Sequence, residues 1–227
     1  MARDTDPVPV VCANLDLLVT AAPGTGSTSL LRWAADLPGA VMVPSATQAC
    51  PTSVDRKHGT IAELRSVGLL SPPSVGIVLT STRDPFDYWH AEWFRTRTRW
   101  VVDAEDPQSW VHDVPGMIQR IQHAVELCFA DWLEVELGQR ADQGDQWHLN
   151  PGHVGEADVV LRMECLEQDL QTMLPQVAAV GGSIPHHNVT GGRPPHATAY
   201  TERARWIVGQ IHGPDLQRFG YTFPSTT

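Results

Sequence analysis

The feature that most constrains the fold of this chain is a short apolar run that leads into a glycine-rich turn, within residues 16–31. The run Leu15–Val19 is bounded by turn residues, which is typical of a strand covered on both faces in a parallel sheet. In the turn, Pro23, Gly24 and Gly26 allow backbone N–H groups to point outward, and a helix start follows. We therefore expect an α/β fold in which the turn and the helix N-terminus cradle phosphate or sulfate. An ordinary strand-to-helix connection is the alternative.

The turn contains no lysine, and this argues against the mononucleotide P-loop. That loop has the pattern Gly-x-x-x-x-Gly-Lys-Ser/Thr, in which the lysine reaches the terminal phosphates. Here Gly26 is followed by Ser27 and Thr28 instead. An ATPase or GTPase is therefore disfavoured, and a P-loop-type small-molecule kinase ranks third among the functions considered.

The order of the other segments predicts a parallel sheet covered by helices. Besides 15–19, strands are expected at 40–43, 75–81 and 159–163, and helices at 27–35, 60–67, 86–99, 115–137, 165–173 and 198–211. Loops are expected at 44–56, 138–153 and 181–196. Since no linker is long enough to divide domains, we expect one domain over 1–227, with an irregular N-terminus at 1–14 and a tail at 224–227.

The composition limits the kinds of ligand and partner that we expect for this chain. The chain has 227 residues, of which 42% are hydrophobic, so it can bury a full core. A net charge of −10 argues against a nucleic-acid binder, so an anionic ligand needs a local basic pocket.

The sequence shows neither a signal peptide nor an apolar run long enough to span a membrane, which predicts a cytoplasmic protein without membrane contact. The widely spaced cysteines form no metal-ligand pattern, so no metal is expected.

A second set of polar residues follows the apolar strand expected at 75–81. Arg83 comes directly after this strand, at the carboxyl edge of the sheet, where open α/β folds place their ligands. Its fork of N–H donors suits bidentate contact with a phosphate. Pairing with Asp84, Asp87 or a helix end is the structural alternative.

Five segments occur in a characteristic order along the chain. They are Pro23–Leu30, Lys57–Arg65, Arg83–Asp87, Asp158–Leu170 and a C-terminal pattern from Pro185 to Tyr221. In these segments the chain resembles the sulfotransferases that use 3′-phosphoadenosine 5′-phosphosulfate (PAPS), most closely the carbohydrate-type branch with small bacterial members. The resemblance implies a P-loop-like three-layer α/β/α fold with a central parallel sheet. It also implies transfer of a sulfuryl group to a hydroxyl of a carbohydrate or other small acceptor, without a metal.

The resemblance assigns roles to particular residues. The 5′-phosphosulfate loop corresponds to Pro23, Gly24, Thr25, Gly26, Ser27, Thr28 and Ser29. Arg83 would bind the 3′-phosphate, which distinguishes this donor from ATP. His58 is the candidate general base for the acceptor hydroxyl, since imidazole exchanges protons near neutral pH. Asp55 and Glu63 are the carboxylate alternatives. A surface role is favoured over nucleotide contact for Arg193 and Arg203.

Two positions depart from the family pattern. Gly24 stands where the family has a lysine or arginine that neutralises the leaving phosphate, and Ala91 stands where it has a serine. Losing a charged donor at a developing oxyanion costs about 3 kcal/mol, and losing a neutral hydroxyl contact costs about 1 kcal/mol. The site is therefore slow, compensated, or a nucleotide-binding relic. The cations considered as compensation are Lys57, Arg32 and Arg56.

The acceptor is not identified by the sequence. Trp89 and Trp93 lie at helical spacing, which favours core packing over stacking on a sugar. Residues 101–116 are acidic and are expected to be solvated surface first and an acceptor-selecting loop second.

Overall fold

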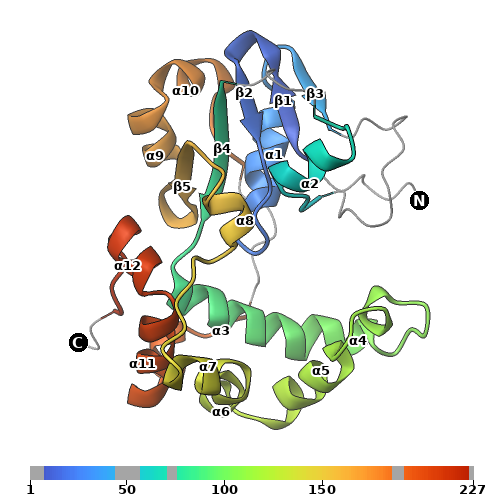
Figure 1. Ribbon diagram of the computed structural model, residues 1–227, viewed down its shortest axis with the longest axis vertical. Coiled ribbons are helices and arrows are strands. Elements are labelled where there is room, and N and C mark those ends of the chain that lie inside the picture. Colours follow the sequence, from blue (N-terminus) through green and yellow to red (C-terminus); the bar gives the residue numbers. More distant parts are fainter. Residues whose placement is uncertain (1–7, 44–56, 71–75, 186–191, 225–227) are drawn as a thin grey trace. The chain divides into compact units, whose positions relative to one another are not determined.

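A computed structural model of the protein describes residues 8–43, 57–70, 76–185 and 192–224. The chain divides into two compact units, each made of two separate stretches (Figure 1). The first unit is Met1–Arg83 with His148–Val189, and the second is Asp84–Trp147 with Thr190–Thr227. One sulfotransferase-like domain over 1–227 stays a prediction.

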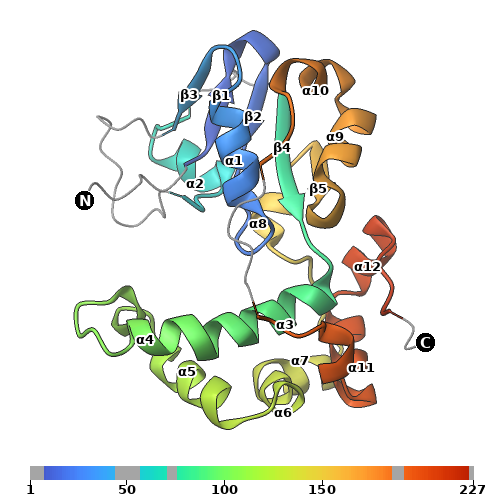
Figure 2. The same cartoon turned by 180° about the vertical axis from the view of Figure 1, so that it is seen from behind.

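The described part of the first unit contains a sheet with the strand order β3-β1-β2-β4-β5 (Figures 1 and 2). The strands are β1 (Val10–Cys12), β2 (Leu17–Val19), β3 (Ala40–Met42), β4 (Ile77–Thr82) and β5 (Val159–Arg162). β2, β4 and β5 are parallel, with Leu18 opposite Val78 and Ser81 opposite Leu161. β1 is antiparallel to both of its neighbours. The protein is thus an α/β protein with a mixed sheet.

The predicted parallel arrangement therefore holds for three adjacent strands and fails at β1. The expected irregular N-terminus is also wrong at residues 10–12, which form that strand. The physical cause is a tight reversal, in which a 3-10 turn at Ala13–Leu15 ends at Asp16 in the left-handed conformation (φ 50°). This reversal folds β1 back onto β2, and such short reversals are hard to distinguish from loops in a sequence.

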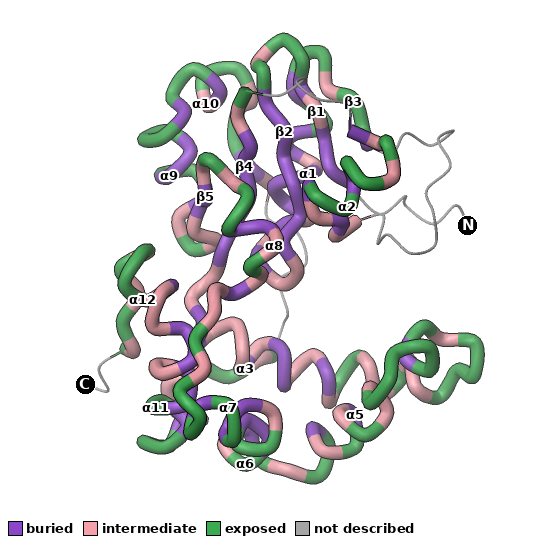
Figure 3. The backbone as a smooth tube through the Cα atoms, in the orientation of Figure 1, coloured by how far each residue is buried: buried purple, intermediate pink, exposed green. Residues whose placement is uncertain are grey.

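The two faces of the sheet pack against different helices. Leu17 and Val19 belong to a cluster with residues of α1 (Ser27–Ala35), α9 (Leu166–Met173) and α10 (Pro175–Gly181). Leu18 and Val78 belong to another cluster with residues of α2 (Ile61–Ser66). Figure 3 shows β2 and β4 as largely buried. The apolar run in this region is therefore covered from both sides, as its composition predicted.

The second unit is helical in its described residues. Its α-helices are α3 (Pro85–Arg95), α4 (Val101–Asp103), α5 (Met117–Glu126), α6 (Phe129–Leu133), α7 (Gln139–Asp142), α11 (Glu202–Ile211) and α12 (Gly213–Phe219). Segments of π-helix at Thr96–Trp100 and Glu134–Gly138 and 3-10 turns at Trp110–His112 and His196–Ala199 complete it. Trp93 packs in its core with Phe129 and Trp132, which confirms the core assignment for that tryptophan.

Several predicted boundaries in this part of the chain are wrong. The helix expected at 115–137 is interrupted at Leu127, whose backbone is extended (φ −98°, ψ 148°) so that α6 can start anew after Cys128. The loop expected at 138–153 contains α7 and, in the first unit, α8 (Pro151–Val154). The loop expected at 44–56 lies outside the described residues.

The start of α3 explains part of the Arg83–Asp87 segment in structural terms. Asp84 is the N-cap, and its Oδ1 accepts a hydrogen bond from the Phe86 N–H at 2.9 Å, with Pro85 in the first turn. The Tyr200 hydroxyl donates to the Phe86 carbonyl at 2.8 Å. Burial raises the pKa of Tyr200, and the carboxylates of Asp84 and Asp87 raise it further.

Candidate functional site

The turn between β2 and α1 is held in shape by its own residues. Gly24 and Gly26 have φ angles of 75° and 76°, in the left-handed region. A Cβ on Gly26 would lie 2.8 Å from Met163 Cγ, so this position needs glycine for both its conformation and its packing. The Thr25 hydroxyl donates to the Ala22 carbonyl at 2.8 Å. The turn is therefore pinned in place beside the N-terminus of α1.

Within the turn, the side chains differ in how far they can serve a ligand. Thr25 is fully buried, and its hydroxyl accepts from Ser81 Oγ at 2.8 Å, which ties the turn to β4. Ser27 and Ser29 are buried as well, whereas Thr28 is half-buried. The predicted loop contacts can thus come from backbone amides and from Thr28 with little rearrangement.

Lys57 contacts this turn from a distant part of the chain. Its Nζ donates to Thr28 Oγ1 at 3.1 Å. Of the other two cations considered as compensation, Arg32 is half-buried in α1 and Arg56 lies outside the described residues. The structure therefore brings an ammonium group to the N-terminus of α1.

His58 is also placed against the turn. Its Nδ1 lies 2.7 Å from the Ala21 carbonyl oxygen. Because a carbonyl only accepts, Nδ1 carries the proton in this contact and Nε2 is the acceptor nitrogen of the neutral ring. In this tautomer Nε2 has a lone pair and can accept a proton, as a general base must.

The carboxylate alternatives to His58 are placed less favourably or not described. Glu63 is exposed and forms a capping box at the start of α2, where its Oε2 accepts from the Thr60 N–H at 2.8 Å. Asp55 lies outside the described residues.

Arg83 follows β4 directly and reaches the same turn. Its Nη1 donates to the Gly24 carbonyl at 3.2 Å. The end of β4 thus brings this guanidinium to the turn. Asp87, one of the alternative partners, pairs within the second unit with Arg193 at 2.7 Å and with His196 at 3.2 Å.

Sequence reasoning missed two residues beside this site. Asn150 Nδ2 donates to the Pro23 carbonyl at 3.1 Å, and the buried His153 Nε2 lies 3.1 Å from the His58 carbonyl. Both belong to α8 or its N-cap, in the stretch that was expected to be a loop. The only available signal was the Asn-Pro start of a helix. These contacts tie the turn and the His58 segment to one short helix.

Two buried hydroxyls lie at the carboxyl ends of neighbouring strands. Thr20 and Thr82 are fully buried, and within the described ranges their Oγ1 atoms have no hydrogen-bond partner. By strand alternation they continue the face of Leu18 and Val78, on which α2 packs. Unsatisfied buried polar atoms are rare in folded proteins and often coincide with functional sites.

Arg162 and Arg203 form ion pairs with carboxylates. Arg162 makes three hydrogen bonds to Asp169 at 2.7–2.9 Å, and this guanidinium lowers the pKa of the carboxyl. This pair accounts for part of the Asp158–Leu170 segment. Arg203 forms exposed ion pairs with Glu134 and Asp142, in agreement with a surface role. Ala91 is half-buried on α3.

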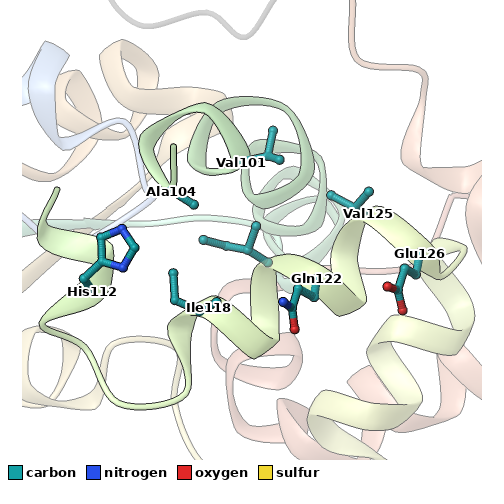
Figure 4. Close-up of a pocket in the computed structure, with 8 residues that line it drawn as sticks. Val101, Ala104, His112, Ile118, Gln122, Val125 and Glu126 are labelled. Atoms are coloured by element: carbon teal, nitrogen blue, oxygen red, sulfur yellow. The ribbon is translucent and has the colours of Figure 1, made fainter. Parts of the chain in front are cut away.

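The second unit contains a pocket of about 360 Å³ (Figure 4). Its lining residues are Val101, Ala104, His112, Ile118, Ile121, Gln122, Val125 and Glu126. The acidic stretch 101–116 thus contributes aliphatic side chains to a pocket, while Glu105, Asp106 and Asp113 are exposed.

Among the described residues, no helix has the length and apolarity needed to cross a membrane. No group of three or more histidine, cysteine, aspartate or glutamate residues in the same ranges is arranged to hold a metal ion.

Comparison with known proteins gave no match: no family model, no curated protein and no solved structure is similar to this chain. The site has to be interpreted from its own chemistry.

Proposed function

We propose that this protein is a sulfotransferase that moves a sulfuryl group from PAPS to a hydroxyl of a carbohydrate or other small acceptor. The observation that supports the proposal most is the convergence of Lys57, His58 and Arg83 on one turn. Two cations and a histidine of suitable tautomer beside a helix N-terminus fit a polyanionic donor and an acceptor that must lose a proton.

In the proposed reaction, the turn and the N-terminus of α1 bind the 5′-phosphosulfate, and Arg83 binds the 3′-phosphate. His58 Nε2 takes the proton of the acceptor hydroxyl while that oxygen attacks sulfur. The bond between sulfur and the bridging oxygen breaks, and its electron pair leaves with 3′-phosphoadenosine 5′-phosphate (PAP). The proposal includes the finer fold, a three-layer α/β/α arrangement around a P-loop-like turn, and a cytoplasmic location.

The test combines transfer and binding. Wild-type protein is incubated with sulfur-labelled PAPS and a panel of carbohydrate, lipid and phenolic acceptors, and PAP binding is measured by calorimetry. We expect labelled product, and we expect Arg83→Gln to weaken PAP binding about 10- to 100-fold because a charge-assisted phosphate contact is lost. Arg203→Gln, which removes an exposed cation of the second unit, is the control and should bind normally. Absence of both transfer and PAP binding would overturn the proposal.

A second function is favoured by one observation. The turn carries no cation of its own, because Gly24 stands at the position where the sulfotransferases that the chain resembles have lysine or arginine. A catalytically impaired protein of the same fold that still binds the nucleotide would show PAP binding sensitive to Arg83→Gln and no transfer to any acceptor.

A further inference from the structure

The backbone at Gly24 is unsuited to the lysine or arginine that the sulfotransferases resembling this chain carry there. Its φ of 75° lies in the left-handed region, where a lysine would be strained. Its carbonyl oxygen accepts a hydrogen bond from Arg83 at 3.2 Å, so this peptide unit already positions another residue. In this turn conformation, a charge at the 5′ end of the donor has to come from another element.

Lys57 lies where that charge is needed. Its Nζ is 3.1 Å from Thr28 Oγ1, in the first turn of α1, where the positive end of the helix dipole also acts. Thr28 is half-buried, so the contact lies at a surface that a ligand can approach.

The segment that carries Lys57 is held by its neighbours. The adjacent His58 bonds the Ala21 carbonyl through Nδ1 at 2.7 Å, and its own carbonyl contacts His153 Nε2 at 3.1 Å. Asn150, the N-cap of the same short helix, bonds the Pro23 carbonyl at 3.1 Å. The segment and the turn are thus fixed by a common support.

We propose that Lys57 replaces the missing loop cation and neutralises the leaving 5′-phosphate. As the bond from sulfur to the bridging oxygen breaks, the electron pair stays on the phosphate oxygen, and the Lys57 ammonium group stabilises that charge while remaining protonated. The acceptor's proton goes to His58. This inference rests on the proposed function. The turn itself has no lysine, and Lys57 supplies the positive charge that the leaving 5′-phosphate needs.

The test pairs a change in the protein with a change in the ligand. PAP carries both phosphates, whereas adenosine 3′-monophosphate lacks the 5′-phosphate. We expect Lys57→Gln to weaken PAP binding about tenfold and to leave adenosine 3′-monophosphate binding, measured by competition, unchanged. Arg83→Gln should weaken the binding of both nucleotides. Lys57→Arg, which keeps the charge, should bind PAP close to wild type.

Turnover and stability complete the test. We expect Lys57→Gln to lower kcat about 100-fold, Lys57→Arg to retain most of it, and thermal unfolding of both variants to match wild type. If wild type binds PAP and Lys57→Gln binds it equally well, the inference is overturned and the proposed function stands. Equal weakening of both nucleotides by Lys57→Gln also overturns it, because the lysine would not act at the 5′ end. Failure of wild type to bind either nucleotide overturns both.

Discussion

The cations at the turn of the first unit and the arginines inside the second unit have different partners. In the first unit, Lys57 and Arg83 contact a hydroxyl and a carbonyl of the turn that precedes α1. In the second unit, Arg120 and Arg193 contact buried or half-buried carboxylates, Arg120 reaching both Glu92 and Glu136.

The difference separates side chains that suit a ligand from side chains that hold the fold. An arginine that shares a carboxylate inside a helical unit is compensated, and removing either partner leaves a buried charge. Lys57 and Arg83 contact oxygens of the turn and, under the proposed function, would bind the phosphates of the donor. We therefore expect substitutions of Lys57 and Arg83 to change activity. Substitutions of Arg120, Arg193 or their carboxylate partners should change stability.

The largest expected effect concerns His58. His58→Ala should lower turnover about 100- to 10,000-fold, because the proton acceptor at Nε2 is lost, while PAP binding stays normal. His58→Asn is the matched variant, because its amide can still donate to the Ala21 carbonyl but cannot act as a base. Steady-state kinetics and calorimetry measure the two properties. Normal turnover in either variant would remove His58 from the mechanism.

The strongest effect on stability is expected in the second unit. Glu92 is buried and contacts both Arg95 and Arg120. Glu92→Gln leaves Arg95 with a neutral partner and leaves Arg120 with Glu136 as its remaining carboxylate, so we expect a loss of about 2 to 3 kcal/mol in the free energy of unfolding. Arg140→Gln, at an exposed ion pair with Asp145, is the control and should cost far less. Urea unfolding measures both, and equal losses would contradict the comparison.

Away from the turn, Arg162 of the first unit pairs with a carboxylate, as the arginines inside the second unit do, and the contribution of this pair to stability can be tested by pH. Asp169 is buried, and the Arg162 guanidinium lowers its pKa below the usual 3.8. Stabilisation by the ionised carboxylate is therefore complete above about pH 5 and is lost as the pH falls through the lowered pKa. We expect Asp169→Asn to cost about 2 kcal/mol at pH 7, with the difference from wild type shrinking below pH 3.8.

Unfolding measured at several pH values checks this prediction. A difference between wild type and Asp169→Asn that is the same at pH 7 and near pH 2.5 would show that the charge of Asp169 is not what stabilises this pair.

The smallest expected effect has the opposite sign. Thr82→Val removes a buried hydroxyl that has no partner in the described structure, so we expect a gain of about 1 kcal/mol in the free energy of unfolding. Thr25→Val is the matched control, since the Thr25 hydroxyl has two partners, Ala22 and Ser81, and its loss should destabilise the protein. A loss of stability in Thr82→Val would show that its hydroxyl is satisfied in solution.

Much of the first unit could be predicted from local sequence. The apolar run before the turn is β2, and the glycines of the turn adopt the left-handed conformation for which glycine is suited. Arg83 was expected at the carboxyl edge of the sheet because it follows an apolar strand directly, and it lies there. Each of these predictions depends on neighbours in sequence.

The elements that the sequence did not predict have a different physical origin. β1 was missed because three apolar residues become a strand only when a reversal at Asp16 pairs them with β2. The break at Leu127 was missed because the apolar spacing continues through it, and the core around Trp132 decides where the chain turns. Propensity and periodicity carry no record of such tertiary choices.

The sequence by itself determined a strand, a lysine-free turn and a helix N-terminus, because positive φ angles and apolar periodicity are local properties of the chain. Only the tertiary structure decided which side chains meet at that turn. Lys57 is 29 positions from Thr28, and Asn150 is 127 positions from Pro23. Contacts over such separations depend on strand order and on helix packing, so the sequence could name Lys57, Arg32 and Arg56 as compensating cations but could not choose among them.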